Sequence, residues 1–327
     1  MESLQPPSSS SVVSSSNSNA LTDSGQRNWL DLPRDAILSI FVKLDTVDLL
    51  VRAHNVCTTW RNISKDPFLY RTIDMSNLDE LETSFELMKT NSQLEILCHR
   101  AIDYSRGHAI DINIEYFGTD DLLSHIADSA SQLRCLRLAC CYSVTHEGLC
   151  VVAEKLSHLE ELDITISGGL THDSLEVIGR SSPQLKTFKF NIEVYLHPHI
   201  VYDDDAFAIA KFMPGLCHLQ LIGNKMSNDG LLAILDGCPQ LESLDIRQCF
   251  NINFIGSLAK RCKEQIKYLL LPNDDTDDYP FETEDYPEDY PYGISDIDLD
   301  LLSEDDYELS DGSEFSEFEF DGNYYDF

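Results

Sequence analysis

The stretch LRCLRLACCYSVTHEGLCVVAEKLSH, residues 133–158, is one copy of a unit that recurs along the middle of the chain. Each copy opens with apolar residues at its first, fourth and sixth positions, here Leu133, Leu136 and Leu138. Successive copies between residues 109 and 271 begin 24, 26, 26, 31, 25 and 25 residues apart. The last two apolar positions flank one polar residue, which is the alternation of a short strand with one buried face. A repeat of this length predicts a solenoid of stacked strands.

A helix is expected between successive strands because a helix-start signal repeats with the same period. Residues that favour helix N-caps occur four positions before an apolar residue in six copies, and five of the six residues two positions after the cap are acidic. The expected caps are Thr119, Thr145, Thr171, Asp203, Ser227 and Asn251, and the apolar residues that follow them are Leu123, Leu149, Leu175, Phe207, Leu231 and Ile255. The alternation predicts an α/β strand–helix solenoid, a horseshoe whose strands line the concave binding face.

A module of three short helices precedes the repeats, over residues 27–72. Pro33 stands at a helix start, and an apolar face follows with helical spacing at Ile37, Ile40, Phe41 and Leu44. A second helix is expected around Leu49 and Leu50, and a third over residues 56–63. So few residues form a small core, which either a partner completes or the following domain extends.

The motifs of this module resemble an F-box. Leu32-Pro33, Leu44, Leu49-Leu50, Val56-Cys57 and Trp60-Arg61 keep the order and spacing of that family over residues 29–72, with Tyr70 where the family usually has Trp. Cys141, Asn224 and Cys249 lie three residues after a strand and resemble the cysteine-containing leucine-rich repeats that follow F-boxes in many plant proteins. The resemblance implies docking onto the Skp-type adaptor of a cullin–RING ubiquitin ligase. The residues that it assigns to this contact are Leu32, Pro33, Ile37, Ile40, Phe41, Leu44, Leu49, Leu50, Val56, Cys57 and Trp60.

Composition divides the chain into four parts. Residues 1–26 are Ser-rich and 273–327 contain 22 acidic residues and no Lys or Arg, so both are expected to be disordered. The three-helix module covers 27–72 and the solenoid 73–272, with an irregular first strand near Ile73 and helices expected over 79–89 and 93–105. The tail is either a solubilising segment or one that docks on a basic groove. The net charge of −34, without clustered cations, argues against nucleic acid.

The polar residues between the last two apolar strand positions form a row that faces outward. We expect Arg137, Asp163 and Lys189 to pair along the sheet, as do Arg134, Glu160 and Lys186, while Gln220 and Asp245 are less committed to neighbours. Either these charges neutralise one another, or they bind a polar target. We also place Tyr195 at the target surface, because the fourth interval is longer than the others and its extra residues, 191–202, are largely apolar. The target-binding candidates are therefore Arg137, Asp163, Lys189, Tyr195, Gln220 and Asp245.

No catalytic motif is found in the chain. It has no Gly-rich phosphate loop, nucleophile elbow or HExxH sequence, and His197, His199 and Asp203 lack an evident fourth metal ligand. We predict no metal, no cofactor and no catalytic residue. Ten scattered cysteines and the lack of a signal peptide or apolar span predict a chain with no membrane contact, in the cytoplasm or nucleus.

These features predict a non-catalytic substrate-recognition subunit of a ubiquitin ligase. The module would bind the adaptor, and the repeats would bind an unknown target protein. The alternative is a protein-binding scaffold outside any ligase, which would use the repeats and the acidic tail.

Overall fold

The computed structural model describes residues 29, 32–76, 90–166, 171–192 and 200–281. The Ser-rich N-terminus, the helix expected over 79–89, the loop with Tyr195, His197 and His199, and the acidic residues from 282 onward lie outside these ranges.

A parallel sheet runs through the described repeats, with its strands in chain order. The strands are β1 Thr72–Met75, β2 Asp111–Glu115, β3 Cys135–Ala139, β4 Glu161–Thr165, β5 Thr187–Asn191, β6 His218–Gln220, β7 Ser243–Asp245 and β8 Tyr268–Leu270. The predicted register is confirmed, because each outward polar residue lies opposite the one expected, as Arg137 does with Asp163 and Gln220 with Asp245. Alternation of apolar and polar residues fixes this register, since a slip of one residue would turn every apolar side chain to solvent.

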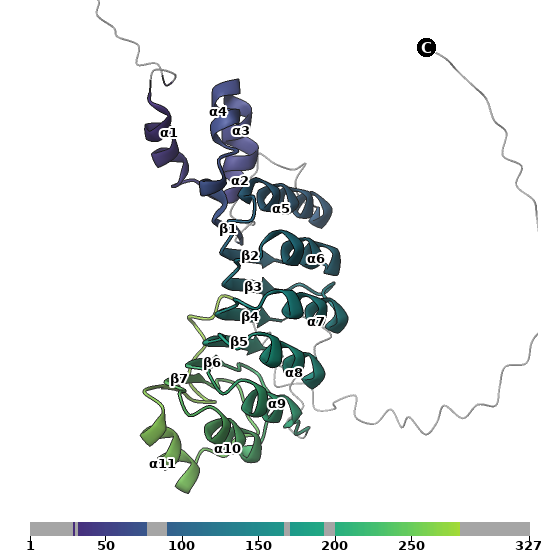
Figure 1. The fold of residues 1–327 in the computed structure, drawn as a ribbon. Helices are drawn as coiled ribbons and strands as arrows, with labels where there is room; N and C mark the ends of the chain where they lie inside the picture. The colour runs from purple at the N-terminus through teal and green to yellow at the C-terminus, as the bar shows by residue number, and fades with distance from the viewer. Residues whose placement is uncertain (1–28, 30–31, 77–89, 167–170, 193–199, 282–327) are drawn as a thin grey trace, which may run out of the picture. The chain divides into compact units, whose positions relative to one another are not determined.

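Helices cover one face of this sheet, as Figure 1 shows for β1–β7 and α5–α10. Their bounds are α5 Asn91–Ser105, α6 Asp120–Ser129, α7 His146–Lys155, α8 His172–Ser181, α9 Asp204–Phe212, α10 Asn228–Gly237 and α11 Gly256–Gln265. Each strand–helix pair leaves an apolar face that only its neighbours can cover, so the buried side chains form one continuous core from Ile37 to Ile266.

The predicted helix caps hold for four of the six helices. Thr119, Thr145 and Ser227 accept hydrogen bonds from backbone N–H groups of the first turn, and Thr171 forms a capping box with Ser174. The prediction for the last helix is wrong. α11 begins at Gly256, and the Asn251 side chain instead donates to the carbonyls of Ile200 and Lys225.

The N-cap position predicted for α9, Asp203, is confirmed, but the buried face of this helix is shifted by one residue. Phe207, expected to be buried, is 46% exposed, whereas Ala206 is buried. The Asp203 carboxylate makes no cap hydrogen bond to α9; it accepts hydrogen bonds from the backbone N–H and hydroxyl of Ser227, at 2.7 and 2.8 Å. Asp120, the first residue of α6, makes the same pair of contacts to Thr145.

Each of these carboxylates packs against a glycine, at a place where a side chain would collide with it. A Cβ at Gly148 would lie 2.0 Å from Asp120 Oδ1, and a Cβ at Gly230 would lie 2.4 Å from Asp203 Oδ1. Asp203 is therefore equivalent to Asp120, so each buried position of α9 comes one residue earlier in the sequence than the helix-start pattern suggests. In this register Asp205 takes the buried position that Gly148 and Gly230 occupy in their helices.

The three-helix module packs onto the first repeat and is continuous with its core. Its elements are α1 Arg34–Phe41, a second segment made of α2 Thr46–Asp48, η2 Leu49–Ala53 and α3 His54–Val56, then α4 Thr58–Ile63 and the turn η3 Pro67–Tyr70. The third helix thus begins at Thr58, with Cys57 as its cap. Thr46 Oγ1 accepts the backbone N–H of Asp74 in β1 at 3.0 Å. Of the two alternatives for its core, extension by the following domain is the one observed.

Candidate functional site

Large apolar side chains lie exposed on the three-helix module. Of the residues assigned to adaptor contact, Leu32, Ile40 and Val56 are exposed, and Val56 is 60% accessible. Several exposed apolar groups in one part of a chain mark an interaction surface, because contact with water is unfavourable for each of them and a partner that covers them lowers the free energy. Pro33 at the start of α1 is exposed as well.

Four of the assigned residues are buried instead and belong to the hydrophobic core of the module. Ile37 and Phe41 in α1 and Leu49 and Leu50 in η2 have almost no accessible surface. They pack beneath the exposed side chains and present almost no surface of their own. Leu44, Cys57 and Trp60 are partly buried, and the Trp60 ring packs edge-on against Phe41 at 5.1 Å between centroids.

Three further exposed residues belong to this surface and were not among those assigned. Val42 follows α1, Phe68 lies in η3 with 60% of its surface accessible, and the Trp29 ring packs edge-on against Trp60 at 6.2 Å. A salt bridge between Arg34 and Asp66 links the start of α1 to η3.

Tyr70, which departs from the family pattern, is fully buried at the base of the module. Its hydroxyl donates to the Ser64 carbonyl at 2.7 Å, and its ring packs against Tyr104 of α5 at 5.6 Å. Burial raises the pKa of this phenol. Tyr70 therefore joins the module to the first repeat.

The outward side chains of β4–β7, here named the strand face, form one continuous polar network. Lys189 pairs with Asp163 at 3.1 Å, and Asp163 accepts from the Thr165 hydroxyl at 2.7 Å. Asn191 bridges Thr165 and Gln220, with N–O distances of 2.9 and 3.2 Å. The predicted pair of Lys189 with Asp163 is thus present.

Two details of the predicted strand face are wrong. Arg137 does not pair with Asp163; it binds Asp111 at 2.9 Å and Glu161 at 3.1 Å, which lie two residues before its register partners in the strands on each side. Gln220 and Asp245 are not uncommitted, because Gln220 donates to Asp245 at 2.8 Å and Asp245 binds the Arg247 guanidinium at 2.8 Å. Asp245 is also buried, which leaves little of it for a target.

In the second charged row, the pair of Arg134 with Glu160 is present at 3.3 Å. Lys186 does not pair with Glu160; its Nζ donates to the Gly215 carbonyl at 3.4 Å.

The start of the acidic tail folds onto the strand face, contrary to the boundary expected at residue 273. Arg247 donates to the Asp275 carbonyl at 2.9 Å and forms a salt bridge with Asp278. Residues 272–281, here named the strap, follow β8 and run beside β4–β7, as the yellow-green trace in Figure 1 shows. A buried guanidinium attracts carboxylates strongly enough to order an acidic segment that composition alone marks as disordered.

Comparison with known proteins agrees with these motifs. The F-box-like family model matches residues 29–76. F-box protein SKIP19 of Arabidopsis thaliana is 41% identical over 317 residues, which cover 94% of this chain and all of that protein. A second Arabidopsis thaliana relative, named as an F-box/LRR-repeat protein (number 22), is 39% identical over 82% of this chain and 88% of its own length. The chain belongs to the F-box/LRR-repeat family.

Among solved structures, a chain of the yeast complex of Rad7 and Elc1 aligns with 53% of this F-box/LRR-repeat protein and with 44% of its own length, at 19% identity and a TM-score of 0.40.

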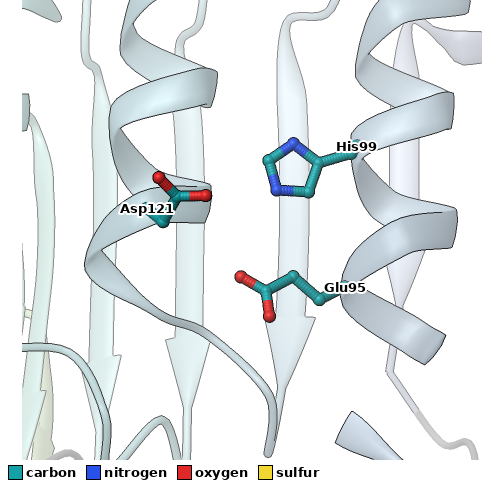
Figure 2. A group of neighbouring side chains, drawn as sticks. All are labelled: Glu95, His99 and Asp121. Carbon is teal, nitrogen blue, oxygen red and sulfur yellow. The ribbon is translucent and has the colours of Figure 1, made fainter. Parts of the chain in front are cut away.

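One group in the described part of this F-box/LRR-repeat protein offers metal-ligand atoms close together. Figure 2 shows Glu95 and His99 of α5 facing Asp121 of α6, and their ligand atoms lie within 4.8 Å of one another. Glu95 also accepts a hydrogen bond from the hydroxyl of Thr119, the N-cap of α6. This bond gives Glu95 a helix-capping role that needs no ion.

The repeat cysteines of this F-box/LRR-repeat protein have a packing role. No disulfide joins any of the ten cysteines within the described residues. The buried thiols of Cys141 and Cys249 donate to strand carbonyls, Cys141 to Ala139 at 3.3 Å and Cys249 to Leu221 at 2.9 Å. Burial raises the pKa of Cys141 to about 12 and also raises that of Cys249. Neither thiol forms the thiolate that redox chemistry requires near neutral pH.

None of the helices within the described residues is long and apolar enough to span a bilayer.

Proposed function

We propose that this chain is the substrate-recognition subunit of a Skp–cullin–F-box ubiquitin ligase. Its F-box would bind a Skp-type adaptor, and its repeats would hold a target protein near the ubiquitin-conjugating enzyme of the complex. Such a subunit accelerates transfer by proximity and needs no nucleophile of its own.

The observation that supports this proposal is the set of exposed apolar side chains on the module. Ile40 and Val56 occupy positions that match the F-box motif, and both are exposed while the residues beneath them are buried. Burial of such a side chain at an interface contributes about 1.5–3 kcal/mol. A few of them supply the free energy of a stable contact, once the cost of association is subtracted.

The repeats are proposed as the target-binding part, since strands line the usual binding face of a solenoid. Arg137, Asp163, Lys189 and Gln220 are partly exposed on this face and are retained as candidates, while Asp245 contributes indirectly by holding Arg247. Tyr195 also remains a candidate.

The test is direct binding of the purified full chain to a Skp-type adaptor, measured by calorimetry. The double variant Ile40→Glu/Val56→Glu removes two exposed apolar contacts and adds two charges to the interface. We expect it to weaken adaptor binding by at least about 100-fold, since two such contacts amount to about 3–6 kcal/mol.

Val151→Glu is the matched control, because Val151 is an exposed valine on α7, outside the F-box. It should bind the adaptor like the parent. Circular dichroism would show that all three proteins are folded. A folded parent that does not bind any Skp-type adaptor would rule out the ligase subunit and favour the alternative of a protein-binding scaffold.

We also propose that the protein acts in the cytoplasm or nucleus. Ten cysteines without a disulfide among the described residues suit a reducing compartment.

A further inference from the structure

The strap rests on the strand face through contacts at several points. The Pro272 carbonyl accepts the backbone N–H of Gln248 at 2.9 Å, and a turn closes where the Tyr279 N–H donates to Thr276 at 2.8 Å. Tyr279, which closes this turn, is partly buried, and its ring packs edge-on against Phe281 at 5.6 Å between centroids. Burial against the sheet raises the pKa of the Tyr279 phenol.

Arg247 is the charged anchor of this contact. Asp245 accepts from its Nε at 3.0 Å and from one terminal nitrogen at 2.8 Å, and Gln220 in turn holds Asp245. These contacts, made within the body of the repeats, hold the guanidinium in one orientation through groups outside the strap. Its other terminal nitrogen points to the strap, where the Asp275 carbonyl and Asp278 carboxylate accept from it. A planar guanidinium held in this way is a receptor for a carboxylate.

The two partners of this salt bridge, Arg247 and Asp278, differ sharply in burial. The Arg247 side chain is 3% exposed, whereas the Asp278 side chain is 70% exposed. The cation belongs to the body of the protein, and the carboxylate approaches it from outside. Another carboxylate can replace Asp278 without disturbing the core.

Two hollows lie beside this ion pair on the strand face. One, of about 250 Å³, is lined by Lys189, His218, Gln220 and Leu270; the other, of about 210 Å³, by Thr165, Asn191 and the strap residues Tyr279, Pro280 and Phe281. Both reach Arg247 and Asp278. The surface therefore offers a cation between two recesses, one of which receives an aromatic side chain.

The sequence that occupies this surface occurs three times in the chain. The bound copy is Asp277-Asp278-Tyr279-Pro280. Glu284-Asp285-Tyr286-Pro287 follows three residues later, and Glu288-Asp289-Tyr290-Pro291 comes directly after it. Each copy has two acids, then tyrosine, then proline. A surface that accepts the first copy has the chemistry to accept the other two.

We propose that the strand face around Arg247 is a binding site for acidic peptides with the sequence Asp-Tyr-Pro, and that the strap is its intramolecular occupant. The aspartate binds Arg247, the tyrosine enters the recess beside Thr165, and the proline fixes the backbone. Under the proposed function, to which this inference adds a target class, the target displays such a segment and displaces the strap. The site itself requires no ligase.

Non-specific charge attraction does not explain this binding. The chain has a net charge of −34, so its overall field repels an acidic peptide. Only a local, oriented cation such as Arg247 overcomes that repulsion, and the bound peptide must match the site in sequence as well as in charge.

The test uses a fluorescently labelled peptide of residues 275–281 and measures its anisotropy with the full chain. Three proteins are compared: the parent, the variant D278N/Y279A, and a variant with the same changes in all three copies, D278N/Y279A/D285N/Y286A/D289N/Y290A. A tethered segment competes at an effective concentration in the millimolar range. We expect affinity to rise from parent to single-copy to three-copy variant, by roughly tenfold in total.

Arg247→Lys in the three-copy background should weaken the peptide by at least about tenfold, because an ammonium cannot reproduce the paired contacts of a guanidinium. Arg134→Ala in the same background is the matched control, since Arg134 is an exposed cation outside the two hollows and should leave affinity unchanged. Circular dichroism would check folding.

Two results would overturn the proposal. One is that the folded three-copy variant does not bind the peptide, and the other is that it binds a scrambled peptide of the same composition equally well. Both are judged without an adaptor, and adaptor binding by the parent is measured separately. A failure of the peptide site is therefore distinct from a failure of the ligase proposal.

Discussion

The F-box presents apolar side chains to solvent, whereas the strand face of the repeats presents charges that already have partners. The exposed side chains of Ile40, Val56 and Phe68 are stabilised when any apolar surface covers them. Lys189 and Arg247 must exchange one set of polar contacts for another, so their net gain from a ligand is small unless the new contacts fit better. The first region is therefore suited to a constant, tight partner, and the second to selection among weaker ones.

The two regions nevertheless share one core, and this can be tested by truncating one aromatic in each. Phe41 in the F-box and Phe188 in β5 are both fully buried. We expect Phe41→Ala and Phe188→Ala each to lower the free energy of unfolding by about 3–5 kcal/mol. Because the core is continuous, urea unfolding of the parent should follow a single transition by circular dichroism and by tryptophan fluorescence. Two separate transitions would show that the regions fold independently.

Charges on the strand face should differ in importance according to burial. Arg247→Ala leaves Asp245 buried without its cation and should cost about 3–5 kcal/mol of unfolding free energy. Lys189→Ala removes a partly exposed pair and should cost less than about 1 kcal/mol. Thermal or urea unfolding of both variants measures the difference. Equal costs would mean that the strand face is not organised around Arg247.

Asp205 should make stability depend on pH. Burial raises its pKa to about 6, above the ordinary value of 3.8, so the folded state holds the proton more tightly than the unfolded state does. This contribution is complete below about pH 4 and is lost as pH rises to about 6, by at most about 3 kcal/mol. Asp205→Asn should therefore stabilise the protein at pH 7 relative to the parent and have little effect at pH 4.

The matched control for this variant is Asp121→Asn, which changes an exposed acid in the first turn of α6. Urea unfolding at both pH values should show a shift of no more than about 0.5 kcal/mol for it. If Asp205→Asn gave the same difference from the parent at pH 4 and pH 7, the titration of Asp205 would not be the cause.

The smallest expected effect concerns the join between the regions. Tyr70→Phe keeps the ring against Tyr104 but removes the hydrogen bond to the Ser64 carbonyl. We expect a loss of about 1–2 kcal/mol in unfolding free energy, the usual cost of leaving a buried acceptor unsatisfied. Adaptor binding by the folded variant should be unchanged, and a large loss of it would mean that Tyr70 also shapes the docking surface.

The sequence predicted the repeats well because their period is a packing requirement. Every strand position fell in the expected register, from Asn113 to Leu270. It predicted the N-cap position of α9 but not its buried face, because Asp203 and Phe207 satisfied the helix-start pattern while the true register put Ala206 inside. Residues 273–281 were likewise predicted to be disordered, because local composition takes no account of their contact with Arg247.

The strand–helix repeats can be read from the amino-acid sequence, because apolar periodicity identifies the side chains that must be buried, and the F-box is recognised there by its family motif. The charge pairs of the strand face and the contact of the first acidic-tail residues with Arg247 can be read only from the folded chain. Arg137 could reach several carboxylates, and it binds Asp111 and Glu161 because backbone twist and side-chain length bring those two within reach. Such contacts join residues far apart in the chain, and their distances exist only once the sheet has formed.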